Sequence, residues 1–162
     1  MGKVLFENEY KMERKLYIEY VYNVLCKKTI IIGLAVAFFG TWLFILMNNK
    51  STAYVMLATS LISIIFAIIT PLITIKQLEE TEKRLNNGNI EKTNIKFLNN
   101  IVMNEGKVHL EFEYHQIIKI VETKNFIVLK ISEQSAILVL KEGFLIGNKY
   151  DFINFIKEQM SK

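Results

Sequence analysis

The sequence predicts a membrane protein of the α+β class: a two-helix transmembrane hairpin and a small cytosolic antiparallel β-sheet domain closed by a C-terminal helix. Residues 29–49 and 51–75 contain no charged side chain and are separated only by Lys50. After residue 89 the apolar residues recur with a period of two, which is typical of strands. From Asn148 the helical period returns.

These changes of pattern divide the chain into four regions. The predicted regions are an N-terminal strand and amphipathic helix (1–28), a transmembrane hairpin (29–75, with spans at about 29–48 and 52–75), a stalk helix (76–88) and the cytosolic domain (89–162).

The N-terminal region begins with alternating residues at 3–10, which suit a short strand. The residues leave open whether this strand joins the C-terminal sheet. From Lys11 an amphipathic helix follows, and it either lies on lipid or packs on the protein's own domain. We expect Tyr17, Tyr20 and Tyr22 to sit at the depth of the lipid headgroups.

Each apolar segment is long enough to span a membrane, because a hydrocarbon core of about 30 Å takes roughly 20 helical residues. Small side chains form one stripe on each span, and these stripes either face each other or drive dimerisation. Their members are Gly33, Ala37 and Gly40 in the first span and Ser60, Ser63, Ala67 and Thr70 in the second. Pro71 is expected to kink the second span, with Thr70 helping to satisfy the freed carbonyls.

Basic residues predict the orientation. Lysines and arginines are concentrated before the first span and after the second, whereas the turn between the spans carries Lys50 alone. The flanking residues are Lys11, Arg14, Lys15, Lys27, Lys28, Lys76, Lys83, Arg84 and Lys92. By the positive-inside rule both termini face the cytoplasm, so we expect a multi-pass membrane protein. A cleaved signal peptide does not fit, since 28 mostly polar residues precede the first apolar run.

The stalk helix should end at Asn86, Asn87 and Gly88, and strands follow it. Short turns between consecutive strands imply an antiparallel meander. The expected strands cover 93–98, 100–104, 107–114, 116–122, 125–131 and 136–141, with turns at 104–106, 123–125 and 132–135. In 107–114 one face is apolar (Val108, Leu110, Phe112, Tyr114) and the other is polar.

The closing helix has a clear start and a clear buried stripe. Asn148 is the expected N-cap, and Asp151 lies in the first turn, where a negative charge favours the helix dipole. Phe152, Phe155, Ile156 and Met160 form the apolar stripe that should cover the sheet.

Composition and motifs offer little chemistry. The net charge of +4 and the pI near 9.0 reflect lysines beside the spans, where anionic lipid explains them, so we expect lipid and no nucleic acid as a partner. Cys26 is the only cysteine, which excludes an intramolecular disulfide; its position at the membrane edge invites acylation or is simply that of an interfacial thiol.

No catalytic constellation, cofactor motif or metal-ligand spacing is present, and we expect none of these sites and no enzyme. His109 shares a strand face with Glu111 and Glu113, but alternation in an exposed strand produces this arrangement without any function. His115 lies six residues further on, with no cysteine nearby.

Four strings of residues carry a family resemblance. They are Tyr114-x-x-Ile117-x-x-Ile120-x-Glu122, Asn125-Phe126-Ile127-Val128-Leu129, Ala136-Ile137-Leu138-Val139-Leu140-Lys141-x-x-Phe144 and Phe152-x-x-Phe155-Ile156. This spacing resembles the bacterial YcxB-like proteins, which pair two transmembrane helices with a small cytosolic domain similar to pleckstrin-homology (PH) folds. The resemblance implies a PH-like domain and a bacterial cell membrane as the location, and it transfers no active-site residues.

The resulting hypothesis is a non-catalytic membrane protein whose cytosolic domain binds a protein, peptide or lipid partner in a regulatory or sensing role. Lys119, Lys124 and Lys130 are the candidates for contact with lipid headgroups. The alternative is an immunity or self-protection protein that acts against a membrane-active peptide or bacteriocin. Homo-oligomerisation stays open.

Overall fold

The computed structural model describes residues 4–47, 49–86, 88–132 and 135–161. The chain forms two compact units, each considered by itself below. One comprises residues 20–78, and the other combines residues 1–19 with residues 79–162. The turn expected between the two apolar spans, the turn expected at 132–135 and Asn87 at the end of the stalk lie partly or wholly outside the described residues.

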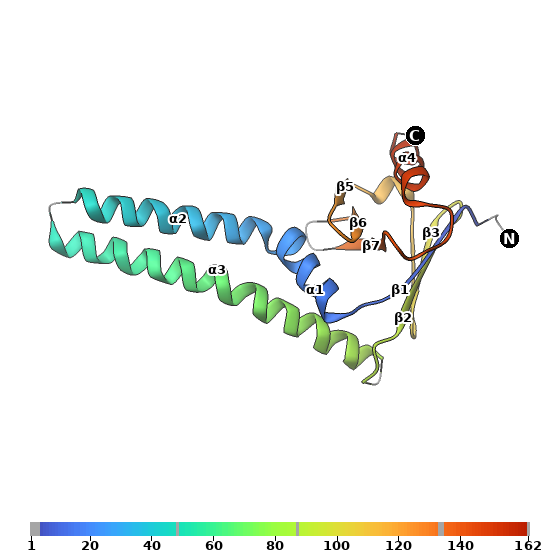
Figure 1. Cartoon of the computed structure of the whole chain (residues 1–162), viewed down its shortest axis with the longest axis horizontal. Coiled ribbons are helices and arrows are strands. Elements are labelled where there is room, and N and C mark those ends of the chain that lie inside the picture. The colour runs from blue at the N-terminus through green and yellow to red at the C-terminus, as the bar shows by residue number, and fades with distance from the viewer. Residues whose placement is uncertain (1–3, 48, 87, 133–134, 162) are drawn as a thin grey trace. The chain divides into compact units, whose positions relative to one another are not determined.

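The first unit is a helical hairpin. Helices α2 (Lys27–Leu46) and α3 (Lys50–Leu85) run side by side, and a π-helical turn, η1 (Val21–Leu25), precedes them (Figure 1). Both are long and apolar enough to cross a membrane. The polar residues 76–85 continue α3 without a break, as predicted, and Gly88 closes it at φ +89°, with its amide donating to the carbonyl of Lys83.

The small residues of the two helices face each other, which confirms the first of the two interpretations. A Cβ atom placed on Gly33 would lie 3.0 Å from the Cβ of Ala67 and 3.2 Å from the Ser63 carbonyl oxygen. One placed on Gly40 would overlap the Ser60 hydroxyl. Because Ser60 and Ala67 are buried by these contacts, this stripe is used within the chain.

Pro71 is accommodated within α3, which remains helical on both sides of it. The proline lacks the amide that would bond the carbonyl of Ala67. The Thr70 hydroxyl donates to the neighbouring carbonyl, that of Phe66, at 2.8 Å, and the Thr74 hydroxyl donates to that of Thr70. The hydroxyls therefore stabilise this stretch, although Thr70 does not bond the freed carbonyl itself.

The second unit contains two antiparallel sheets. The larger has the order β4-β3-β2-β1-β8, formed by Val108–Phe112, Ile101–Glu105, Lys92–Phe97, Phe6–Lys11 and Phe144–Ile146. The smaller has the order β5-β6-β7, formed by Lys119–Glu122, Phe126–Lys130 and Ala136–Leu140. The predicted strands therefore exist, but the single meander was wrong, because the 3-10 turn Tyr114–Gln116 separates two meanders.

The N-terminal strand β1 lies inside the larger sheet. It pairs with β2 over six residues, from Phe6 opposite Phe97 to Lys11 opposite Lys92. Figure 1 shows these two strands side by side. On its other side β1 pairs with β8. The segments that precede and follow the hairpin are therefore neighbouring strands of one sheet. The N-terminal strand therefore joins the C-terminal sheet, which the sequence had left open.

Strand β4 is shorter and more exposed than expected. It ends at Phe112, and Tyr114 lies in the 3-10 turn, where its hydroxyl donates to the Leu98 carbonyl at 2.9 Å. Leu110, placed on the buried face by its alternation, is 42% exposed because β4 is the edge of the sheet. The alternation thus identified the strand but not its position at an edge.

Helix α4 (Lys149–Met160) covers one face of the larger sheet. The Phe152 ring packs against Phe97 at 4.6 Å, Phe6 at 5.4 Å and Phe144 at 5.3 Å between centroids. Phe152 and Ile156 are fully buried, as predicted, and the remainder of the stripe is half-buried. Burial of each such ring contributes about 2 to 3 kcal/mol.

The amphipathic helix α1 (Arg14–Tyr20) packs on the domain, which decides between its two interpretations. Leu16 and Tyr17 are buried, and the Glu19 carboxylate accepts the backbone amide of Asn125, in the β5–β6 turn, at 2.7 Å. Tyr17 and Tyr20 are buried, whereas Tyr22 is exposed; the depth of these rings relative to lipid headgroups stays a prediction.

Candidate functional site

The histidines lie on open surface. On β4, His109 Nδ1 is 2.6 Å from Asn104 Oδ1 and its Nε2 is 3.3 Å from Glu111 Oε1, and both the histidine and Glu111 side chains are 58% exposed. His115 pairs with Glu113 at 2.9 Å and is more exposed still. Such pairs lack the desolvated setting in which acid–base groups work.

No group of three or more His, Cys, Asp or Glu side chains with metal-binding geometry occurs among the described residues. Cys26 is buried, with its thiol 3.7 Å from the Thr74 hydroxyl across the hairpin. Burial argues against acylation and favours a packing role for this thiol.

The hairpin carries an apolar groove of about 350 Å³ between its helices. It is lined by Ile32, Ala35, Val36, Phe39, Gly40, Leu43, Met56 and Thr59. Its lining is almost entirely apolar, and the Thr59 hydroxyl donates to the Val55 carbonyl of its own helix.

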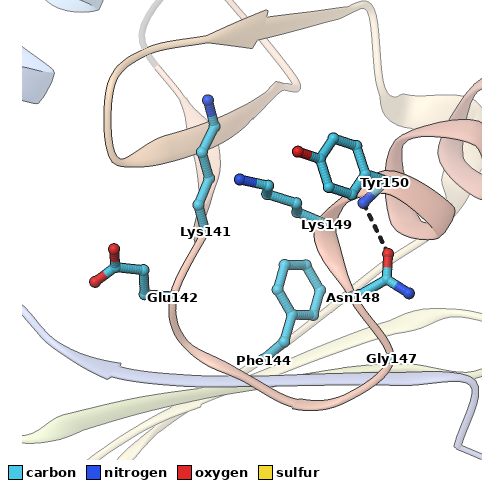
Figure 2. A pocket seen from close by; sticks show the side chains of 7 residues that line it. All are labelled: Lys141, Glu142, Phe144, Gly147, Asn148, Lys149 and Tyr150. Atoms are coloured by element: carbon cyan, nitrogen blue, oxygen red, sulfur yellow. Dashed lines mark hydrogen bonds between the residues drawn. The ribbon is translucent and has the colours of Figure 1, made fainter.

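A pocket of about 280 Å³ opens where β7 leads through β8 into α4 (Figure 2). It is lined by Lys141, Glu142, Phe144, Gly147, Asn148, Lys149 and Tyr150. This composition combines an aromatic floor with charges of both signs.

The polar groups of this pocket are already positioned by the fold. The Lys141 ammonium donates to the Thr123 carbonyl at 2.7 Å and lies 3.4 Å from Glu122, which holds the β5–β6 turn. Asn148 caps α4 as predicted, because its Oδ1 accepts the amides of Tyr150 and Asp151. The helix terminus is therefore largely satisfied without an added anion.

The Lys149 ammonium lies 5.0 Å from the centroid of the Tyr150 ring, a cation–π contact. Tyr150 itself is 71% exposed, and Figure 2 shows its ring beside Lys149 at the mouth of the pocket. An aromatic side chain with a polar tip on open surface is characteristic of protein interfaces.

Beside the pocket runs the free edge of β8. Leu145 is 62% exposed and Ile146 is 41% exposed, and β8 has a neighbour only on its β1 side within the described sheet. Sequence reasoning missed this strand, since three residues between two glycines are too short for a period-two signal. The glycines Gly143 and Gly147 that frame it were the only available indication.

The three lysines considered for headgroup contact do not form one patch. Lys119 and Lys130 are cross-strand partners at one end of the smaller sheet. Lys124 lies in the β5–β6 turn at the other end, five residues and about 15 Å further along the strand direction. Their charges are therefore divided between two ends of the sheet.

Comparison with known families matches residues 98–156 to the YcxB-like protein family. The matched segment runs from the end of β2 through most of α4, and it includes the pocket and the β8 edge. No curated protein matches the chain, and no solved structure does. The resemblance inferred from the strings between Tyr114 and Ile156 is confirmed, because residues 98–156 match the model of the YcxB-like family.

Proposed function

We propose that this chain is a membrane-anchored binding protein whose cytosolic, PH-like domain captures an extended segment of a partner protein at the β8 edge. Its role is regulatory or sensing, and it carries out no catalysis. The observation on which this rests is the combination of a free strand edge, exposed apolar residues and an adjoining pocket.

The pairing of β1 with β2 supports the anchored arrangement. The two strands flank the hairpin in the sequence and pair over six residues. If α2 and α3 each cross the bilayer, both flanks must lie on one side of it for this sheet to form. The basic residues on those flanks favour the cytoplasmic side.

The PH-like assignment is supported by layout. The domain has two antiparallel sheets, and a C-terminal helix packs its phenylalanines on one of them. Domains of this kind bind ligands by sheet edges and by the groove beside the closing helix.

Recognition by added strand explains the composition of the β8 edge. A partner strand would bond the free backbone groups of β8, while Leu145 and Tyr150 supply apolar contact area. A lipid headgroup is a weaker occupant, since Glu142 lies in the pocket and Asn148 already caps α4.

Site-specific photocrosslinking tests this proposal. A photoreactive phenylalanine analogue at Leu145 should give a discrete crosslinked adduct in intact cells, and Tyr150→Ala should reduce its yield. The matched control is the analogue at Leu110, which is also exposed and lies on the opposite edge strand, β4. Adducts of equal yield at both edges, or at neither, would refute the β8 site.

Expression of the hairpin alone distinguishes partner binding by the domain from self-protection against a membrane-active peptide. If the cytosolic domain binds the partner, cells that express residues 20–78 alone should not show the partner-dependent function of the full chain. Protection from a membrane-active peptide by the hairpin alone would instead favour a self-protection protein.

A further inference from the structure

The C-terminal end of α3 buries polar groups that have no partner. Glu82 is 7% exposed and Asn86, one turn later, is 5% exposed. Both carboxylate oxygens of Glu82, and both polar atoms of the Asn86 amide, are inaccessible and lack a hydrogen bond within the described part of the chain. Leaving such groups unsatisfied costs free energy, so each calls for a physical explanation.

The surroundings of this pair are tightly packed. A Cβ atom on Gly106 would overlap Asn86 Oδ1 and would lie 3.0 Å from Glu91 Cγ, so the β3–β4 turn touches the helix end directly. Gly106 itself has a φ of +55°. The helix end therefore has no room to move its amide without moving the turn.

The charges that act on Glu82 come from three elements. Glu105, at the end of β3, is a like charge, while Lys11 on β1 and Lys83 on the same helix are opposite charges. Glu105 also accepts a hydrogen bond from the Thr93 hydroxyl at 3.3 Å, which keeps it at this position. Two carboxylates thus share one partly enclosed site.

We propose that Glu82 and Glu105 form a proton-sensitive latch that holds the end of α3 on the β1–β3 end of the sheet. When Glu82 carries a proton, its carboxyl group is neutral and the buried contact with the sheet is stable. When the proton leaves, a buried anion without a hydrogen-bond partner among the described residues stands near the Glu105 carboxylate, and the last turns of α3 detach more often.

The direction of the pH effect follows from the shift. Burial first, and then repulsion by Glu105, raise the pKa of Glu82 to about 7 from an ordinary value of 4.5. Glu82 lies beyond the apolar part of α3, among the polar residues 76–85. The closed state binds more protons than the open one between these values, so the latch weakens as the pH rises from 4.5 through about 7 and the loss levels off above that.

The latch and the second apolar span belong to the same continuous helix, α3. The helix that ends on the sheet at Leu85 is the same one that carries the second apolar span. A change of proton concentration near neutral pH would therefore alter how the span's own helix is attached to the domain. This device is independent of the partner proposed above.

Hydrogen–deuterium exchange of the full chain in detergent tests the latch. After correction for the intrinsic pH dependence of amide exchange, the equilibrium constant for opening of residues 79–86 should increase by about tenfold between about pH 6 and about pH 8. In Glu82→Gln, whose side chain is permanently neutral, this increase should vanish. Glu80→Gln is the matched control, because Glu80 is exposed on the same helix, and it should retain the increase.

A direct titration completes the test. Carbon-detected magnetic resonance of the glutamate carboxyls should show one group that titrates near pH 7, absent in Glu82→Gln and shifted to lower pH in Glu105→Gln. The proposal is overturned if every glutamate titrates below about pH 6. It is equally overturned if Glu82→Gln and the unaltered chain show the same exchange profile.

Discussion

The side-chain amide of Asn8 forms hydrogen bonds with both the carbonyl and the amide of Leu140. Asn8 Nδ2 donates to the Leu140 carbonyl at 2.8 Å, and the Leu140 amide donates to Asn8 Oδ1 at 3.1 Å. Asn8 belongs to β1 of the larger sheet and Leu140 to β7 of the smaller. One fully buried side chain therefore joins the two sheets at the point where their backbones do not pair.

Asn8→Ala should destabilise the domain by about 1 to 3 kcal/mol, because it removes the partner of two part-buried backbone groups of Leu140. Denaturant unfolding of the full chain in detergent, followed by circular dichroism, measures this loss. Asn89→Ala, at an exposed loop position, is the matched control and should change little. If the two variants unfold alike, the amide does not join the sheets.

Gly33→Leu should separate α2 from α3, since its side chain would collide with Ala67 and the Ser63 carbonyl. Overpacking of this kind costs about 1 to 3 kcal/mol. Thermal unfolding in detergent should show a lower midpoint. Ala58→Leu adds a leucine at an exposed position of α3 and should be tolerated. A normal midpoint for Gly33→Leu would show that the small residues do not set the helix spacing.

Glu19 should make the attachment of α1 sensitive to acid. Burial raises the pKa of its carboxyl, but hydrogen bonds from Thr123 and Asn125, together with Lys124, outweigh burial and hold the pKa below its ordinary value of 4.5. A depressed pKa means that the stabilisation is complete above that value and is lost as the pH falls through the folded-state pKa.

The measurement for Glu19 is the free energy of unfolding between about pH 3 and about pH 6. Glu19→Gln should lower it by about 1 kcal/mol near pH 6 and by less near pH 3, because the anion no longer accepts the Asn125 amides. Glu13→Gln, exposed at the start of the same segment, serves as the control. A loss that is the same at both ends of the pH range would exclude the carboxylate as its source.

Features set by local pattern were predictable from the sequence. Charge-free length identified α2 and α3, the alternation identified six strands of the C-terminal region, and Asn148 with the Phe152 stripe identified α4. These signals depend on neighbouring residues alone, as does the family spacing around Tyr114–Glu122 that the family comparison confirmed.

Features set by distant pairing were not predictable. The insertion of β1 between β2 and β8 joins segments more than 80 residues apart, and no local pattern encodes it. The exposure of Leu110 and the burial of Tyr17 depend on which strand forms an edge and which surface receives α1. The β8 edge and the Glu82 enclosure were missed for the same reason, since neither exists before the sheets assemble.

Cysteine accessibility in intact cells tests the central claim, a hairpin that crosses the membrane twice with its domain on the inner side. In a Cys26→Ser background, Ser51→Cys probes the tip of the hairpin and Lys107→Cys probes the β3–β4 turn, both exposed positions. A membrane-impermeant maleimide should label the tip in intact cells and label the turn only after permeabilisation. Labelling of Lys107→Cys in intact cells, or protection of Ser51→Cys until lysis, would contradict the account.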